Sequence, residues 1–69
     1  MSERLINRLS EMRAELSLTQ AALAEKVGVT RKTINTVENG VFVPSTILAL
    51  KLSSALGRSV EEIFSLSAE

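Results

Sequence analysis

The segment from Arg31 to Glu38 carries the side chains best suited to recognise another molecule. At about 100° per residue of an α-helix, Ile34 and Val37 point to one side, and a polar set points to the other: Arg31 at its edge, Lys32, Asn35, Thr36 and Asn39, with Thr33 on a flank. In direct readout of DNA, Arg or Lys binds guanine, Asn binds adenine and a Thr methyl group contacts thymine. Composition alone, however, favours a simple solvated helix face.

Two short helices, expected at 20–27 and 31–38, must position this polar set. Thr19 and Thr30 precede them and are suited to N-capping. Gly28 follows the first helix, where a left-handed C-cap suits glycine. A turn of only three residues joins the two helices and sets them at a steep angle.

A steep crossing at such a turn requires a small residue in the first helix, and Ala24 lies four positions before Gly28. Ile34 and Val37 supply the inward face of the second helix. Gly28 allows the left-handed turn, Ala24 allows the close crossing, and the two apolar residues face inward. Together these features predict a helix-turn-helix. With this motif added, we prefer the base-reading interpretation of the polar set over the solvated face, and assign base reading to Arg31, Lys32, Asn35 and Thr36.

The remaining chain predicts three more helices and therefore an all-α, five-helix bundle in one domain, 1–69. Leu5, Leu9, Met12 and Leu16 form one stripe at helical spacing, which predicts a helix at about 3–16. Further helices are expected at about 46–56, between Ser45 and Gly57, and at about 60–64, after a capping box that begins at Ser59. No strand-like alternation is evident, and the tail 65–69 is expected to fray.

Composition argues against an enzyme and against a metal or cofactor site. The 69 residues include no Cys, His, Asp, Tyr or Trp, so few groups suit acid–base, nucleophilic or zinc chemistry. The net charge is zero, but the middle of the chain is basic and its end is acidic. We therefore expect one face able to meet phosphate. The lack of Cys and of an apolar targeting segment fits a cytoplasmic, nucleoid-associated protein.

The motifs of this chain resemble the Cro/repressor-type (XRE-type) helix-turn-helix family. The resemblance rests on Leu18-Thr19-Gln20, Leu23-Ala24-Glu25-Lys26-Val27-Gly28-Val29-Thr30, Ile34-Asn35 and Val37-Glu38-Asn39-Gly40. It continues through Pro44-Ser45, Leu48-Ala49-Leu50-Lys51-Leu52, Leu56-Gly57 and Ser59-Val60-Glu61-Glu62-Ile63-Phe64. It implies a compact lambda-repressor-like fold of bacterial or phage regulators, with helix 31–38 in the DNA major groove.

The same resemblance suggests phosphate contacts and one internal tie. Thr19 and Gln20 begin a helix, where free backbone N–H groups favour an anion, and the family implies that Gln20 and Asn39 contact the DNA backbone. We also expect Thr33 to reach a phosphate. Arg13 and Glu38 resemble a family pair that ties the first helix to the third, although they could also be two unrelated surface charges.

Apolar residues beyond the needs of one small core predict a homodimer on a palindromic operator. In helix 46–56, Ile47 and Leu50 lie off the inward stripe. Phe64 and Leu66 stand beside the tail and are expected to form a two-fold interface, joined by Phe42. The expected function is that of a DNA-binding repressor. Two alternatives stay open: an antitoxin-type regulator that also binds a toxin protein, and a protein-interaction module that has lost DNA binding.

Overall fold

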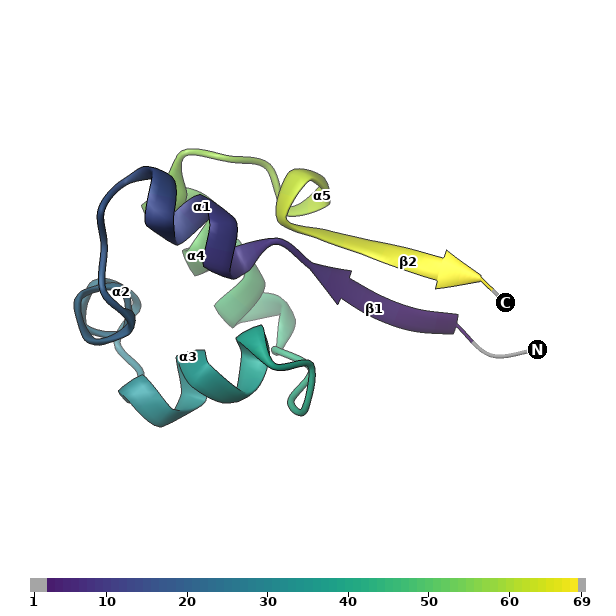
Figure 1. The fold of residues 1–69 in the computed structure, drawn as a ribbon, viewed down its shortest axis with the longest axis horizontal. Helices are drawn as coiled ribbons and strands as arrows, with labels where there is room; N and C mark the ends of the chain where they lie inside the picture. Colours follow the sequence, from purple (N-terminus) through teal and green to yellow (C-terminus); the bar gives the residue numbers. More distant parts are fainter. Residues whose placement is uncertain (1–2, 69) are drawn as a thin grey trace.

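The computed structural model describes residues 3–68 as five helices and one two-stranded sheet. The chain begins with strand β1 (Glu3–Asn7) and ends with β2 (Phe64–Ala68). Between them lie α1 (Leu9–Glu15), α2 (Gln20–Val27), α3 (Arg31–Glu38), α4 (Thr46–Leu56) and α5 (Val60–Ile63). The helices form one body, and the two strands extend from it as a ribbon that carries both ends of the chain (Figure 1). Among the described residues, no helix is both long and apolar enough to cross a membrane.

The helix-turn-helix consists of α2 and α3, whose bounds coincide with the ranges expected from the sequence. The Thr19 side chain accepts a hydrogen bond from the Ala22 amide (3.0 Å), and Thr30 accepts one from the Thr33 amide (3.2 Å). Gly28 ends α2 with φ of 77°, a left-handed conformation that residues with a Cβ adopt only at a cost. These local contacts explain why both helices begin and end where they do.

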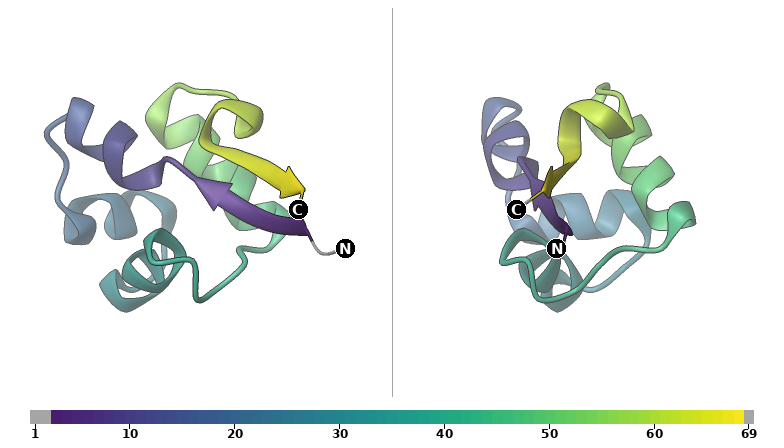
Figure 2. Two further views of the ribbon diagram at one scale, coloured as in Figure 1. Left: turned by 45° about the vertical axis from the view of Figure 1, so that its right-hand side comes forward. Right: turned by 90° about the vertical axis from the view of Figure 1, so that its right-hand side faces the viewer.

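The hydrophobic core lies where all five helices meet. Its most deeply buried side chains are Leu9, Leu23, Ile34, Val37, Leu52 and Ile63. α4 supplies Leu48, Leu52 and Leu56 from one stripe, and its range also coincides with the expected one. Two views at different angles show α1 and α4 on opposite sides of the body, with α3 crossing beneath them (Figure 2). α3 contributes its inner face, with Ile34 and Val37, to this core.

The N-terminal segment differs from the expected helix 3–16, and the fold is not purely α-helical. β1 pairs antiparallel with β2, with Leu5 opposite Leu66 and Asn7 opposite Phe64. The expected stripe from Leu5 to Leu16 spans two elements. Leu5 lies in the strand β1, whereas Leu9 and Met12 lie on the buried side of α1. Leu16, the last member of the stripe, is 50% exposed.

The C-terminal segment also differs from the frayed tail expected at 65–69, since its described residues belong to a strand. α5 ends at Ile63, one residue before the expected bound, and Phe64–Ala68 form a strand; residue 69 lies outside the described part. The capping box at Ser59 is present, and the Glu62 side chain accepts a hydrogen bond from the Ser59 backbone N–H (2.8 Å). This bond lowers the pKa of Glu62, with a smaller contribution from Arg58.

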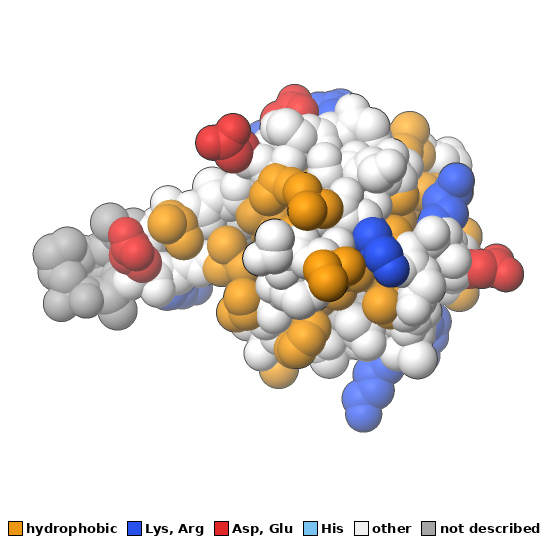
Figure 3. Space-filling model, turned by 180° about the vertical axis from the view of Figure 1, so that it is seen from behind, with side chains coloured by type: hydrophobic (Ala, Val, Ile, Leu, Met, Phe, Trp, Pro, Cys, Tyr) orange, Lys and Arg blue, Asp and Glu red, His pale blue; other side chains and the backbone are white. Residues whose placement is uncertain are grey.

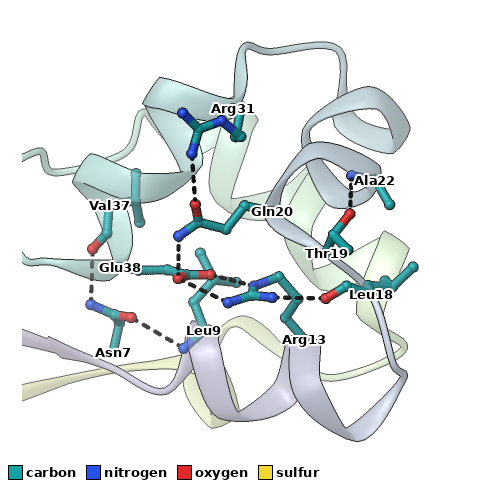
Figure 4. Close-up of polar contacts among 10 residues, drawn as sticks. All are labelled: Asn7, Leu9, Arg13, Leu18, Thr19, Gln20, Ala22, Arg31, Val37 and Glu38. Carbon is teal, nitrogen blue, oxygen red and sulfur yellow. Dashed lines mark hydrogen bonds and ion pairs between the residues drawn. The ribbon is translucent and has the colours of Figure 1, made fainter.

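Asn7 joins the ribbon to two helices at once. Its side-chain Oδ1 accepts a hydrogen bond from the Leu9 amide (3.1 Å), at the start of α1. Its Nδ2 donates to the Val37 carbonyl (3.0 Å), in the last turn of α3. A single side-chain amide at the end of β1 therefore binds the first amide of α1 and a carbonyl in the last turn of α3, as the close-up shows (Figure 4).

Replacing Asn7 by Ala should destabilise the fold by about 1–3 kcal/mol, since it removes two part-buried hydrogen bonds between different elements, each contributing roughly 0.5–1.5 kcal/mol. Urea unfolding followed by circular dichroism would measure the loss. Ser54→Ala, at an exposed position of α4, is the control and should change stability by less than about 0.5 kcal/mol. Equal midpoints for the two variants would contradict the role given to Asn7.

Candidate nucleic-acid interface

The outer face of α3 is polar and accessible, while its inner face is closed. Ile34 and Val37 are 0% and 1% exposed, which fixes the orientation of the helix about its axis. Arg31 and Lys32 are exposed in its first turn, and Asn35 and Thr36 follow, both half-buried. Within residues 3–68, Lys32 forms no hydrogen bond or ion pair. The four residues expected to read bases thus lie together on one surface.

Hydrogen bonds between residues three or four positions apart hold several polar side chains of this face. The Asn39 Nδ2 donates to Asn35 Oδ1 (3.2 Å), and the Thr36 hydroxyl donates to the Thr33 carbonyl (2.9 Å). The hydroxyls of Thr33 and Thr30 are bonded to each other (3.1 Å). The amide N–H groups of Asn35 can still donate, and the methyl group of Thr36 remains an apolar contact.

Gln20, at the first position of α2, bridges the two helices of the motif. Its Nε2 donates to Glu38 Oε1 (2.9 Å), and its Oε1 accepts from Arg31 Nη1 (3.4 Å). Gln20 therefore belongs to an internal network and also stands beside the first turn of α3 (Figure 4). Thr19 lies next to it and uses its hydroxyl to cap α2.

Arg13 and Glu38 form the ion pair on which this network rests. Arg13 Nε lies 2.7 Å from Glu38 Oε2, and its Nη2 donates to Glu38 Oε1 (3.3 Å). The Arg13 Nη1 donates to the Leu18 carbonyl (2.8 Å), just before α2. The Glu38 side chain is only 6% exposed. One guanidinium therefore binds α1 to the end of α3 and to the segment that leads into α2.

Three of these contacts were not foreseen from the sequence. Asn7, the Leu18 carbonyl and the link from Gln20 to Glu38 all join residues on different elements. Asn favours positions at the start of a helix, where its side chain can accept a hydrogen bond from a backbone N–H. The helix expected at 3–16 placed Asn7 in its interior, so this preference could not indicate the contact. The two other contacts depend on the angle between helices, which no local pattern reports.

The residues expected at a two-fold interface are placed differently from one another. Phe42 is 47% exposed and Leu66 is 66% exposed. Phe64 is only 8% exposed and belongs to the monomer core. The expectation that Phe64 would face a partner is therefore wrong: β2 turns its side chain inward, on the face that it shares with Leu5.

Sequence comparison places this geometry in a known family. Residues 9–63 match the model of a helix-turn-helix family. An uncharacterised HTH-type transcriptional regulator of Bacillus subtilis, YgzD, is 43% identical over 63 residues, which is 91% of this chain and 96% of the relative. A second uncharacterised HTH-type transcriptional regulator, from Methanothermobacter thermautotrophicus, is 54% identical over 57 residues, 81% of this chain and 83% of the relative. The chain belongs to the XRE-type helix-turn-helix family.

A solved structure supports the same assignment. The restriction-modification controller protein C.AhdI from Aeromonas hydrophila superposes with a TM-score of 0.76 and is 36% identical, covering 80% of this chain and 83% of that one. The two chains thus share the helical helix-turn-helix fold, and the described part of this chain also contains the two-stranded ribbon.

Removing one partner of the Arg13–Glu38 pair should destabilise the fold strongly. Arg13→Met leaves Glu38 buried and unpaired, so we expect a loss of about 3 kcal/mol or more, and adding Glu38→Gln should restore part of it. A double-mutant cycle in urea measures the coupling. Arg58→Met is the matched control, because its pair with Glu15 is exposed and contributes at most about 1 kcal/mol. Additive single effects at Arg13 and Glu38 would contradict the tie.

Proposed function

We propose that this chain is a sequence-specific, double-stranded DNA-binding transcriptional regulator that acts as a homodimer. The observation that carries the proposal is the outer face of α3, where Arg31, Lys32, Asn35 and Thr36 lie opposite Ile34 and Val37. Membership in a family whose relatives are named HTH-type transcriptional regulators supports it. α3 is the element that we place in the major groove.

Each of the four base-reading side chains of α3 has a chemical role in this proposal. Lys32, with no partner among residues 3–68, would donate to guanine O6 or N7, as Arg31 would at the edge of the face. Asn35 would bind adenine through its amide, and the Thr36 methyl group would contact thymine. Arg31 approaches the bases from a direction restricted by Gln20, since the two side chains are hydrogen-bonded.

Phosphate contacts would come from the first turn of α2 and from the flank of α3. The N-terminus of α2 offers backbone N–H groups and a positive dipole end, and Gln20 keeps a second amide hydrogen for an oxygen of the DNA backbone. We assign Thr19, Thr33 and Asn39 to the same role. Such contacts place the protein on the duplex without reading its sequence.

The operator follows from the symmetry of a dimer. Two copies related by a two-fold axis would set their α3 helices about 34–36 Å apart, one turn of DNA, and require a palindromic site. Occupancy of a site that overlaps a promoter would exclude RNA polymerase from it, so we propose repression as the mode of action. Selection of the chain against a pool of random duplexes tests binding and motif together: an enriched palindrome supports the proposal, and no enrichment contradicts it.

Changing Lys32 or Asn35 to Ala should each cost about 1–3 kcal/mol on the selected duplex and relax the preference at one base pair. Fluorescence anisotropy with the selected site and with single-base variants would measure both effects. Lys26→Ala, an exposed cation in the last turn of α2, is the control and should leave base preference unchanged. If neither α3 variant changed preference, α3 would not be the reading element.

The charge of Arg31 should be visible in the salt dependence of binding. Each cation that neutralises a phosphate adds roughly −0.9 to the slope of log K against log salt. Arg31→Ala should therefore flatten the slope by up to that amount, whereas Gln20→Ala should weaken binding with nearly the parent slope because Gln is uncharged. A Gln20 variant that flattened the slope as much as the Arg31 variant would contradict these roles.

A further inference from the structure

The side-chain amide of Gln20 lies between two groups of opposite hydrogen-bonding character. Its Nε2 donates to Glu38 Oε1 (2.9 Å), and its Oε1 accepts from Arg31 Nη1 (3.4 Å). A carboxylate accepts hydrogen bonds and a guanidinium donates them, and neither can do the reverse. Both neighbours therefore require the same orientation of the amide, with its NH2 group toward Glu38 and its oxygen toward Arg31 (Figure 4).

The neighbour on the inner side, Glu38, is fixed in place. Its side chain is 6% exposed, and its two oxygens accept from Arg13 Nε (2.7 Å) and Nη2 (3.3 Å). A third donor of Arg13 binds the Leu18 carbonyl (2.8 Å), which holds the guanidinium from a second side. Turning the Gln20 amide over would bring two acceptor oxygens together without a hydrogen between them, which is costly beside a buried charge. The orientation of Gln20 is thus set from the interior.

The neighbour on the outer side, Arg31, depends on Gln20 for its position. It is exposed in the first turn of α3, and among residues 3–68 its side chain forms this one hydrogen bond. A space-filling view from behind shows Lys and Arg side chains projecting from the lower edge of the molecule, with no Asp or Glu side chain visible beside them (Figure 3). α3 lies along the same edge in Figure 1. The Gln20 oxygen is therefore the group that restrains this long cation before it meets a ligand.

This restraint affects recognition because a long cation beside DNA has two destinations. A free arginine can turn to the phosphates, which are numerous and carry no sequence information. With one edge of its guanidinium held by Gln20, Arg31 keeps other N–H groups for the two acceptors of guanine, O6 and N7. An orientation that is fixed before binding also lowers the conformational entropy lost on contact.

From this chain of contacts we propose that Glu38 and Gln20 are positioning residues that make the base contact of Arg31 selective. The proposal rests on the DNA-binding function proposed above and adds the determinant of specificity at one base pair. Glu38, whose side chain is buried, fixes the amide of Gln20, and that amide fixes Arg31. A substitution in the interior should therefore change the sequence preference of the surface.

Removing the inner end of this network without unfolding the chain tests the proposal. Arg13→Met with Glu38→Leu replaces a buried ion pair by apolar side chains, an exchange that proteins often tolerate well. Arg31→Ala first identifies the base pair that Arg31 reads on the selected duplex. At that base pair, discrimination (the ratio of the dissociation constants for a changed and the selected duplex) should fall about tenfold in the double variant. The salt slope should not flatten, because the charge of Arg31 is retained.

Gln20→Met removes the link itself, at a half-buried position. It should lower the same discrimination about tenfold. Adding Arg13→Met and Glu38→Leu to it should lower the discrimination no further, since all three substitutions act through one contact. Asn7→Ala is the control, because it removes the bond to the Val37 carbonyl in the last turn of α3. It should lower stability while leaving the discrimination unchanged.

A measurement without DNA separates this proposal from the proposed function. In ¹H–¹⁵N spectra of the free chain, the Arg31 Nε–H signal should shift in Gln20→Met. It should also shift when Arg13 and Glu38 are replaced, although neither is hydrogen-bonded to Arg31. An unchanged signal would overturn the proposal, as would full discrimination in either variant or an equal loss in Asn7→Ala, and in each case α3 could still read DNA. A parent chain that discriminates at no base pair would overturn both proposals.

Discussion

The ion pair between Arg13 and Glu38 is the contact on which the arrangement of the helix-turn-helix depends. A carboxylate that is 6% exposed is stable only with its charge compensated, and Arg13 compensates it with two donors while a third binds the Leu18 carbonyl. The pair therefore joins α1, the entry to α2 and the end of α3. Through Gln20 it reaches Arg31, so the position of one side chain on the outer face is coupled to a charge in the interior.

The helices that begin and end at capping residues could be predicted from the sequence. The two strands could not, because they depend on pairing between residues far apart in the chain. Thr19, Gly28 and Thr30 act within three or four residues of themselves, so α2 and α3 were recognisable from a short window. The ribbon pairs Glu3 with Ala68, and no short window contains both partners. The same limit explains Phe64, whose burial depends on the strand opposite it. In the candidate site, the polar residues of α3 were predicted as a set, whereas the bonds that orient Gln20 and Arg31 required the angle between the helices.

A chain with zero net charge can still present two surfaces of distinct character, and this one does. α3 offers hydrogen-bonding and cationic side chains suited to a charged, polar partner, and its two apolar residues are withdrawn into the core. α4 has the opposite character, since its buried stripe is apolar and its exposed side also carries Ile47 and Leu50. The hydrogen bonds of Asn7 join the ribbon, which borders the apolar surface, to the last turn of α3. The bonds of Asn7 thus connect the elements that carry the two surfaces.

The central claim is that the tied α3 presents its outer face to DNA. It is tested most directly by ¹H–¹⁵N correlation spectra of the labelled chain during titration with its selected duplex. The account predicts that the largest shift changes occur at the start of α2 and along α3, including the side-chain amides of Gln20 and Asn35. Saturable binding that left those signals in place and shifted instead the amides of α4 and the ribbon would contradict it.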